Sequence, residues 1–264
     1  MSVSPEGASV DAPEDAPAIL ALDFDGVVCD ALEECALVTW LGIHPYDTSV
    51  PGPAQLAAIP AEFLERFRKV RDYSRLLDHF VVAHLPEAAS IASQADFDRL
   101  FEALDPSYVQ KFTAKATAAR DRFRTLEDDF WLDLHTLYPG IPALLRRFAG
   151  SIVVVTAKDA ASVRAILGRH GLGDTVAEIF GETGAKAEAV QDVCGRWGVP
   201  PERVTFIDDN LTNAIRVGAI GARSRWAQWG YQTPEHRAEA ARLGVSPLGL
   251  DEIDGLHPAA PVTA

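Results

Sequence analysis

An apolar run of four residues ends in two acidic residues near the start of the chain, in the sequence ILALDFDG (residues 19–26). Such a short run is typical of a strand buried on both faces of a sheet. Residues two apart on a strand point to the same side, so Asp23 and Asp25 would project together at its carboxyl end. In open parallel sheets ligands bind at this edge, and Gly26 lets the backbone turn there. Adjacent carboxylates repel each other unless a cation or a shared proton relieves them, so the pair predicts a metal site.

Further apolar runs lie mostly in the second half of the chain. They cover residues 152–155 and 204–207 and, more weakly, 177–180, 224–229 and 247–250. Amphipathic stretches separate them, at residues 141–148, 160–170, 186–197 and 211–217. Strands that alternate with helices predict a parallel sheet with helices on both faces. We therefore expect an α/β fold with a Rossmann-like, three-layer core.

The region between the first strand and this alternation has helical spacing and no convincing strand. Its apolar residues favour helices at 31–41, 61–84, 88–103 and 106–137. We therefore expect an inserted all-α domain at residues 30–138, within a core formed by residues 18–29 and 139–250. Residues 1–17 have almost nothing to bury and are expected to be a disordered tail, and residues 251–264 a C-terminal tail.

Charge and cysteine usage exclude several classes of protein. The formal net charge of −14 would repel a phosphate backbone, so we expect no nucleic-acid partner. The three cysteines are an odd number without zinc-ligand spacing, which favours reduced thiols. No apolar run is long enough to span a membrane, and the first residues do not resemble a secretion signal, so a cytoplasmic location is expected. A homodimer is left open.

A second acidic pair follows the apolar run at residues 204–207, in the sequence VTFIDDNLTN. Asp208 and Asp209 would lie at the same sheet edge as the first pair. Oxygen ligands from two strand ends suit Mg²⁺, which binds through one or two carboxylates together with substrate phosphate. The run at residues 152–155 leads to Thr156, and Lys186 starts a predicted helix. A hydroxyl and an ammonium are suitable donors for a phosphoryl group.

Together these four motifs, in order over about residues 18–230, resemble those of the haloacid dehalogenase (HAD) superfamily. The resemblance implies that Asp23 is a nucleophile that forms an aspartyl-phosphate, and that Asp25 is the general acid and base. It implies phosphoryl binding by Thr156 and Lys186. The inserted region would then be the family's α-helical cap, which closes over the nucleophile.

The resemblance also implies a set of metal ligands. Mg²⁺ would be held by the Asp23 side chain, the Asp25 main-chain carbonyl and an acid of the Asp208–Asp209 pair. Relatives with a single acid at this motif align it with Asp209, so Asp209 is favoured as the direct ligand and Asp208 as support. Asn213 departs from the family pattern, because many relatives carry a second acid there.

Substrate contacts are expected from the cap and from one core lysine. Arg68, Arg71 and Arg75 are three and four residues apart and would share one helical face, with His79 one turn further. They could meet a second anionic group, although a solvated face is the commoner role of such arginines. Lys158 either reaches the site or points to solvent.

The expected function is Mg²⁺-dependent hydrolysis of a small phosphate monoester, such as a sugar phosphate or a phosphoglycolate-like acid. Relatives that cleave carbon–halogen bonds lack an acid at the position of Asp25, so its presence favours phosphoryl transfer. A phosphomutase with the same intermediate and a non-catalytic binding module are the alternatives. A receiver domain fits less well, because its phosphorylated aspartate would lie on a middle strand.

Overall fold

The computed structural model describes residues 18–44 and 47–258. Six parallel strands form the main sheet in the order β5-β4-β1-β6-β7-β8. Their bounds are Ile19–Leu22 for β1, Ile152–Val155 for β4, Val176–Phe180 for β5, Val204–Asp208 for β6, Arg223–Ala227 for β7 and Ser246–Leu248 for β8. The predicted tail 1–17 lies outside the described residues.

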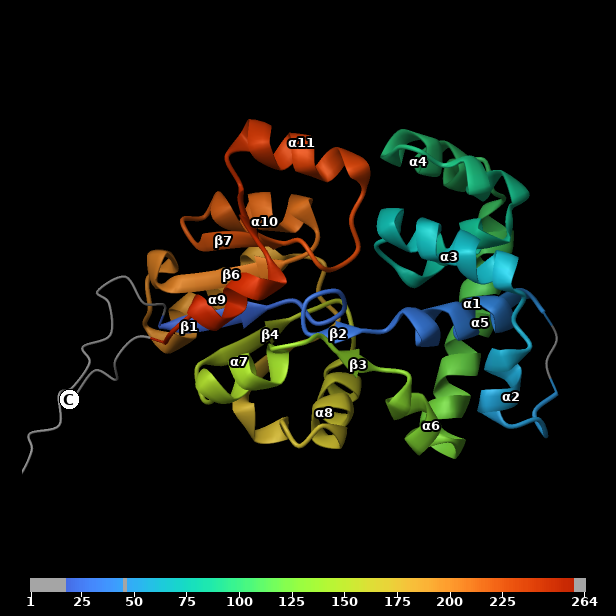
Figure 1. Cartoon of the computed structure of the whole chain (residues 1–264), viewed down its shortest axis with the longest axis horizontal. Helices are drawn as coiled ribbons and strands as arrows, with labels where there is room; N and C mark the ends of the chain where they lie inside the picture. The colour runs from blue at the N-terminus through green and yellow to red at the C-terminus, as the bar shows by residue number, and fades with distance from the viewer. Residues whose placement is uncertain (1–17, 45–46, 259–264) are drawn as a thin grey trace, which may run out of the picture.

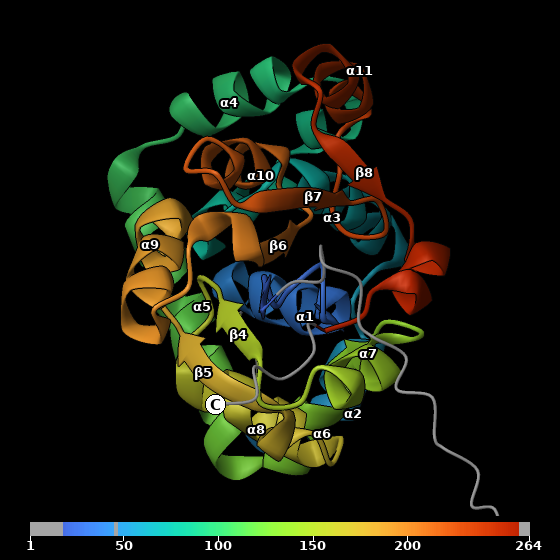
Figure 2. The same ribbon diagram turned by 90° about the vertical axis from the view of Figure 1, so that its left-hand side faces the viewer.

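Helices cover both faces of this sheet (Figure 2). One face packs on α9 (Lys186–Trp197) and α10 (Leu211–Gly218), with Val190 and Val217 against Phe206. The other face packs on α7 (Ile141–Arg147) and α8 (Ala160–Arg169), and Leu144, Ile166 and Leu20 belong to one buried apolar cluster. These layers confirm the predicted α/β core, because each apolar run is buried by the amphipathic stretches beside it.

The inserted region lies at one end of the core (Figure 1). Its helices, which we call the cap, are α1 (Leu32–Ile43), α2 (Gly52–Ala57), α3 (Ala61–Tyr73), α4 (Gln94–Glu102), α5 (Pro106–Leu126) and α6 (Asp128–Asp133), with 3₁₀ helices η1 (Leu77–His84) and η2 (Pro86–Ser90). A helical insertion is therefore confirmed. Within the cap, the most extensive packing is between α1 and α5, which lie side by side.

Several details of this region differ from the sequence prediction, and the helices expected at 88–103 and 106–137 are each interrupted. Short strands β2 (Cys29–Asp30) and β3 (Thr136–Leu137) pair antiparallel where the chain enters and leaves the cap. The helix expected at 61–84 is also broken: α3 ends at Tyr73, and Ser74 has extended backbone. The Ser74 hydroxyl donates a hydrogen bond of 2.8 Å to the Val70 carbonyl, which also accepts from the Ser74 N–H at 3.1 Å.

The C-terminal part of the described chain packs on the core. Helix α11 (Pro234–Leu243), which the sequence patterns did not single out, joins β7 to β8. The 3₁₀ helices η3 (Gly173–Thr175) and η4 (Pro201–Arg203) precede β5 and β6, and η5 (Leu250–Gly255) follows β8. Ile253 is only 1% exposed, so the start of the expected tail 251–264 is held by apolar burial. No helix in the described ranges is long and apolar enough to cross a membrane.

Candidate active site

The ends of three neighbouring strands bring the predicted site residues together. Leu22 of β1 is in register with Ile207 of β6 and with Val154 of β4. The residues that follow these strands therefore emerge at one edge of the sheet. The N–H of Asp23 donates to the Ile207 carbonyl at 2.9 Å, which continues the ladder up to the acidic residue.

Three buried carboxylates meet at this edge. Asp23, Asp208 and Asp209 are 9%, 0% and 5% exposed, and each offers an oxygen within 4.8 Å of the others. Lys186, the first residue of α9, contacts two of them: its Nζ lies 2.6 Å from Asp23 Oδ2 and 2.8 Å from Asp208 Oδ2. One ammonium among three carboxylates leaves two formal negative charges, so the donor set suits a divalent cation with oxygen ligands.

The pKa values of the second acidic pair indicate the same shortage of positive charge. Burial raises the pKa of the Asp208 carboxyl to about 6, and Asp23 adds to the rise while Lys186 opposes it. Burial also raises the pKa of Asp209 to about 7, with repulsion from Asp208 and Asp23 adding to it. A bound cation would favour the ionised form of both groups.

The two acids of this pair have different surroundings. Asp208 Oδ1 accepts a hydrogen bond from the Asn210 N–H at 2.7 Å. Its Oδ2 accepts from the Asn213 amide at 3.1 Å as well as from Lys186. Asp209 Oδ2 accepts from the Tyr231 N–H at 2.7 Å, and Asp209, unlike Asp208, lines the cavity described below. This geometry suits Asp208 to orienting Lys186 and Asn213, and Asp209 to binding an ion.

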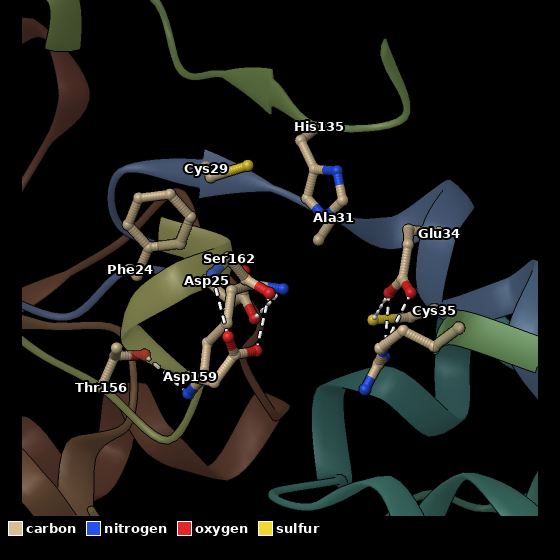
Figure 3. A network of polar contacts seen from close by, with 12 residues as sticks. Phe24, Asp25, Cys29, Ala31, Glu34, Cys35, His135, Thr156, Asp159 and Ser162 are labelled. Atoms are coloured by element: carbon tan, nitrogen blue, oxygen red, sulfur yellow. Dashed lines mark hydrogen bonds and ion pairs between the residues drawn. The ribbon is translucent and has the colours of Figure 1, made fainter. Parts of the chain in front are cut away.

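Asp25 follows Asp23 by two residues and pairs with a lysine of the core. Lys158 Nζ is 3.2 Å from Asp25 Oδ2, so of its two open orientations the structure places Lys158 in the site. Figure 3 shows Asp25 beside Asp159 and Ser162 on the core side, with Glu34 facing from the cap. Asp25 lines two adjoining cavities, one at the sheet edge and one beneath the cap.

Thr156 closes the opposite side of the site at the end of β4. It is 2% exposed, its N–H donates to the Phe180 carbonyl at 2.9 Å, and its hydroxyl accepts from the Lys158 N–H at 3.2 Å. These bonds fix the residue while the hydroxyl proton stays available to a ligand. Thr156 and Lys186 line the same cavity, as expected for a pair of phosphoryl-binding donors.

This cavity, the reaction cavity, has a volume of about 370 Å³ and lies between core and cap. Its lining includes Asp23, Asp25, Thr156, Lys158, Lys186 and Asp209 from the core, and Arg71, Ser74, Arg75 and Leu76 from the cap.

The three arginines predicted to share one helical face are separated in the structure. Arg71 and Arg75 line the reaction cavity, whereas Arg68 is exposed and does not line it. A substrate contact by Arg68 therefore stays a prediction, because its exposed position on α3 does not bring it to the cavity. His79 also lies away from the site, with its ring 4.7 Å from that of Phe101.

Gly230 and Tyr231, which follow β7, complete the site. They were not identified from the sequence. A Cβ on Gly230 would lie 2.2 Å from the Gly26 carbonyl oxygen and 2.5 Å from Asp209 Cβ. The Tyr231 hydroxyl lies 3.0 Å from Asp30 Oδ1, and the Arg71 guanidinium lies 3.6 Å from the Tyr231 ring centroid. Their place just beyond a strand end, at the same sheet edge, is the signal that could have identified them.

Comparisons with known proteins agree with this geometry. A protein-family model described as haloacid dehalogenase-like hydrolase matches residues 17–219. No curated protein matches the chain.

Solved structures with similar folds were found in several bacteria. A predicted phosphatase from Clostridium acetobutylicum has a TM-score of 0.59 at 16% identity, covering 91% of this chain and 97% of its own. A haloacid dehalogenase-like family protein from Streptococcus pneumoniae has a TM-score of 0.55 at 15% identity, with 91% and 97% covered. A predicted phosphoglycolate phosphatase from Haemophilus somnus has a TM-score of 0.52 at 15% identity, with 82% and 88% covered. At these identities the likeness shows the fold alone.

Proposed function

The chain belongs to the haloacid dehalogenase-like hydrolase family, and from this premise we propose that it is a Mg²⁺-dependent phosphatase. Its substrate would be a small-molecule phosphate monoester, cleaved through an aspartyl-phosphate on Asp23. One observation carries the proposal: the Asp23 carboxylate lies in the reaction cavity, 2.6 Å from Lys186 and within the buried acidic cluster.

The residues around Asp23 have the chemistry that phosphoryl transfer requires. Asp23 Oδ1 accepts a hydrogen bond from the Phe24 N–H at 2.7 Å, which orients the carboxylate. Lys186 and the Thr156 hydroxyl would hold the phosphoryl oxygens, and Lys186 would also offset their charge. Asp23 and Asp209 would bind Mg²⁺ with the Asp25 main-chain carbonyl, and Asp208 would support them. When bound, the ion supplies positive charge between the acids and the phosphoryl group.

Asp25 would carry the proton in both steps of the reaction. As an Asp23 oxygen bonds to phosphorus and the bond to the leaving oxygen breaks, Asp25 gives its proton to that oxygen. Asp25 then takes a proton from the water that cleaves the aspartyl-phosphate, which releases inorganic phosphate and restores Asp23. Lys158, 3.2 Å away, would fix the orientation of the Asp25 carboxylate.

Released phosphate measured on a panel of phosphate monoesters tests the proposal. We expect turnover with Mg²⁺ and its loss with EDTA, since the cluster would otherwise keep uncompensated charge. Asp23→Asn should lower kcat by about 10³-fold or more, which corresponds to about 4 kcal/mol, because an amide is a poor nucleophile. Thermal unfolding of this variant should show an intact fold. Residual activity above about a tenth, or an isomer formed without free phosphate, would contradict the proposal.

A further inference from the structure

A second cavity, the cap cavity, adjoins the reaction cavity beneath the cap and has a volume of about 320 Å³. Asp25, Lys158, Arg71 and Arg75 line both cavities, so the two are continuous at the proposed proton carrier. None of Asp23, Thr156, Lys186 and Asp209 lines the cap cavity. A ligand that reacts at Asp23 would therefore place its leaving group, not its phosphoryl group, in the cap cavity.

Most charged side chains around the cap cavity are already paired. Arg120 forms two hydrogen bonds with the buried Glu34, at 2.7 and 2.9 Å. Lys158 pairs with Asp25, and the Asp159 carboxylate pairs with Arg124 at 3.3 Å. These pairs largely cancel one another's charge, and Glu182, an exposed acid in the same lining, adds a negative charge.

Arg71 and Arg75 are the exception among the basic residues that line the cap cavity. Neither guanidinium forms an ion pair with a carboxylate of the described residues. Arg71 Nη1 donates to the Ser74 carbonyl at 3.3 Å, and its Nε is buried without a hydrogen-bond partner. Arg75 Nη1 donates to the Asp72 and Ser74 carbonyls, both at 3.1 Å. Carbonyl oxygens orient the two groups, and Asp209 attracts both from a distance without a direct ion pair.

The position of Arg71 is held by aromatic packing. Its guanidinium lies 3.6 Å from the Tyr231 ring centroid and 5.5 Å from that of Phe80. Such stacking pre-organises the planar group without using its hydrogen-bond donors. Asp72 is the nearby acid on the same helix, but its carboxylate accepts from the Gln232 N–H at 3.3 Å. A guanidinium that is held in place and has no carboxylate in direct contact is suited to binding an anion through charge-assisted hydrogen bonds.

From this we infer that the substrate carries a second anionic group, a carboxylate or a phosphate, on the leaving group, and that Arg71 and Arg75 bind it. The inference rests on the proposed function and narrows it, because sugar monophosphates with an uncharged leaving group lack this contact. Leu77 and Phe80 line the remaining wall of the cap cavity and would contact the carbon skeleton.

Matched substrate pairs test this inference. 3-Phosphoglycerate differs from glycerol 3-phosphate by a carboxylate, and fructose 1,6-bisphosphate differs from fructose 6-phosphate by a second phosphate. We expect kcat/KM to be higher by about tenfold or more for the anionic member of at least one pair. The pair that shows the preference identifies the anionic group.

The variants Arg71→Met and Arg75→Met should each remove about tenfold of this preference, because kcat/KM should fall further for the anionic member of the pair than for the uncharged one. Arg68→Met is the matched control, because Arg68 is exposed on the same helix and lines neither cavity. Thermal unfolding of every variant checks the fold, and Arg75→Met provides a second reading should Arg71→Met be unstable.

Equal kcat/KM for both members of both pairs would overturn the inference while leaving the proposed function standing. So would a loss of preference in Arg68→Met as large as in Arg71→Met. If wild-type protein with Mg²⁺ releases phosphate from no substrate, the proposed function fails, and the inference fails with it.

Discussion

The main-chain N–H of Tyr231 donates a hydrogen bond of 2.7 Å to the carboxylate of Asp209. The hydroxyl of the same tyrosine lies 3.0 Å from Asp30 Oδ1 on β2, where the chain enters the cap, and its ring stacks on Arg71 of the cap. Tyr231 alone thus contacts an acid of the buried cluster, the strand where the chain enters the cap, and the cap itself. The hydrogen bond from the Tyr231 N–H holds Asp209 Oδ2 and so orients the carboxylate. The other carboxylate oxygen is then free to bind an ion.

The first prediction separates the two acids after β6. Asp209→Asn should raise the Mg²⁺ concentration for half-maximal activity by about tenfold or more, because it removes a charged ligand without changing side-chain size. Asp208→Asn should change this concentration less and lower the free energy of unfolding by about 1–3 kcal/mol, because the Lys186 and Asn213 donors would lose the carboxylate oxygen that they share. Mg²⁺ titration of phosphate release and urea unfolding measure the two effects. A larger Mg²⁺ requirement in Asp208→Asn than in Asp209→Asn would contradict the assignment.

The second prediction concerns the close packing of Gly230. In Gly230→Ala the added Cβ would lie 2.2 Å from the Gly26 carbonyl oxygen and 2.5 Å from Asp209 Cβ. We expect a loss of about 2 kcal/mol or more in the free energy of unfolding and a higher Mg²⁺ requirement, because Asp209 must move.

Gly195→Ala is the matched control for this substitution. Gly195 lies inside α9, and a Cβ there has nothing within 4 Å, so alanine should stabilise the protein by about 0.5–1 kcal/mol. Chemical unfolding and Mg²⁺ titration of both variants measure the contrast. Unchanged stability in Gly230→Ala would show that the backbone there can relax.

The third prediction concerns the contribution of His135 to the pH dependence of stability. His135 is 1% exposed, its Nδ1 donates to the Trp131 carbonyl at 2.9 Å, and its Nε2 is buried without a partner. Burial, aided by Lys158, lowers the pKa of His135 to about 4. Because the folded-state pKa lies below the unfolded value of about 6.5, this stability is present above about pH 6.5 and is lost as the pH falls towards 4.

Urea unfolding at about pH 7 and about pH 4.5 measures this contribution, which is at most about 3 kcal/mol for His135. His135→Gln should therefore show a smaller difference between the two pH values than wild type. His257→Gln, at an exposed position, serves as control and should keep the wild-type difference. An equal pH dependence in wild type and His135→Gln would exclude His135 as a source.

The main strands and the acidic pairs could be predicted because their signals are local. The apolar runs at β1, β4 and β6 are each short, continuous and followed by a polar residue, which is the pattern of a parallel strand ending at a ligand-binding edge. Lys186 begins a helix whose predicted range, 186–197, agrees with α9. The order of these motifs along the chain was also enough to indicate the family.

The end of α3 and the roles of its arginines could not be predicted in the same way. Helical spacing extends past Tyr73, and no glycine or proline marks the break. Arg68 and Arg71 are equivalent by spacing alone, yet one is exposed and the other stacks on Tyr231. Side-chain roles on a helix depend on what packs against each face, which lies elsewhere in the chain.

By itself, the sequence therefore determined the α/β alternation, the helical insertion and the set of acids, hydroxyl and lysine at the strand ends, because residue type and local periodicity specify these. Only the tertiary structure decided that Lys158 faces Asp25, that Asp209 rather than Asp208 lines the reaction cavity, and that Arg71 forms no ion pair with a carboxylate of the described residues. The contacts responsible join distant segments, such as Tyr231 with Asp30, 201 residues apart. Such contacts follow from how the cap and the core pack together, and no local pattern encodes that packing.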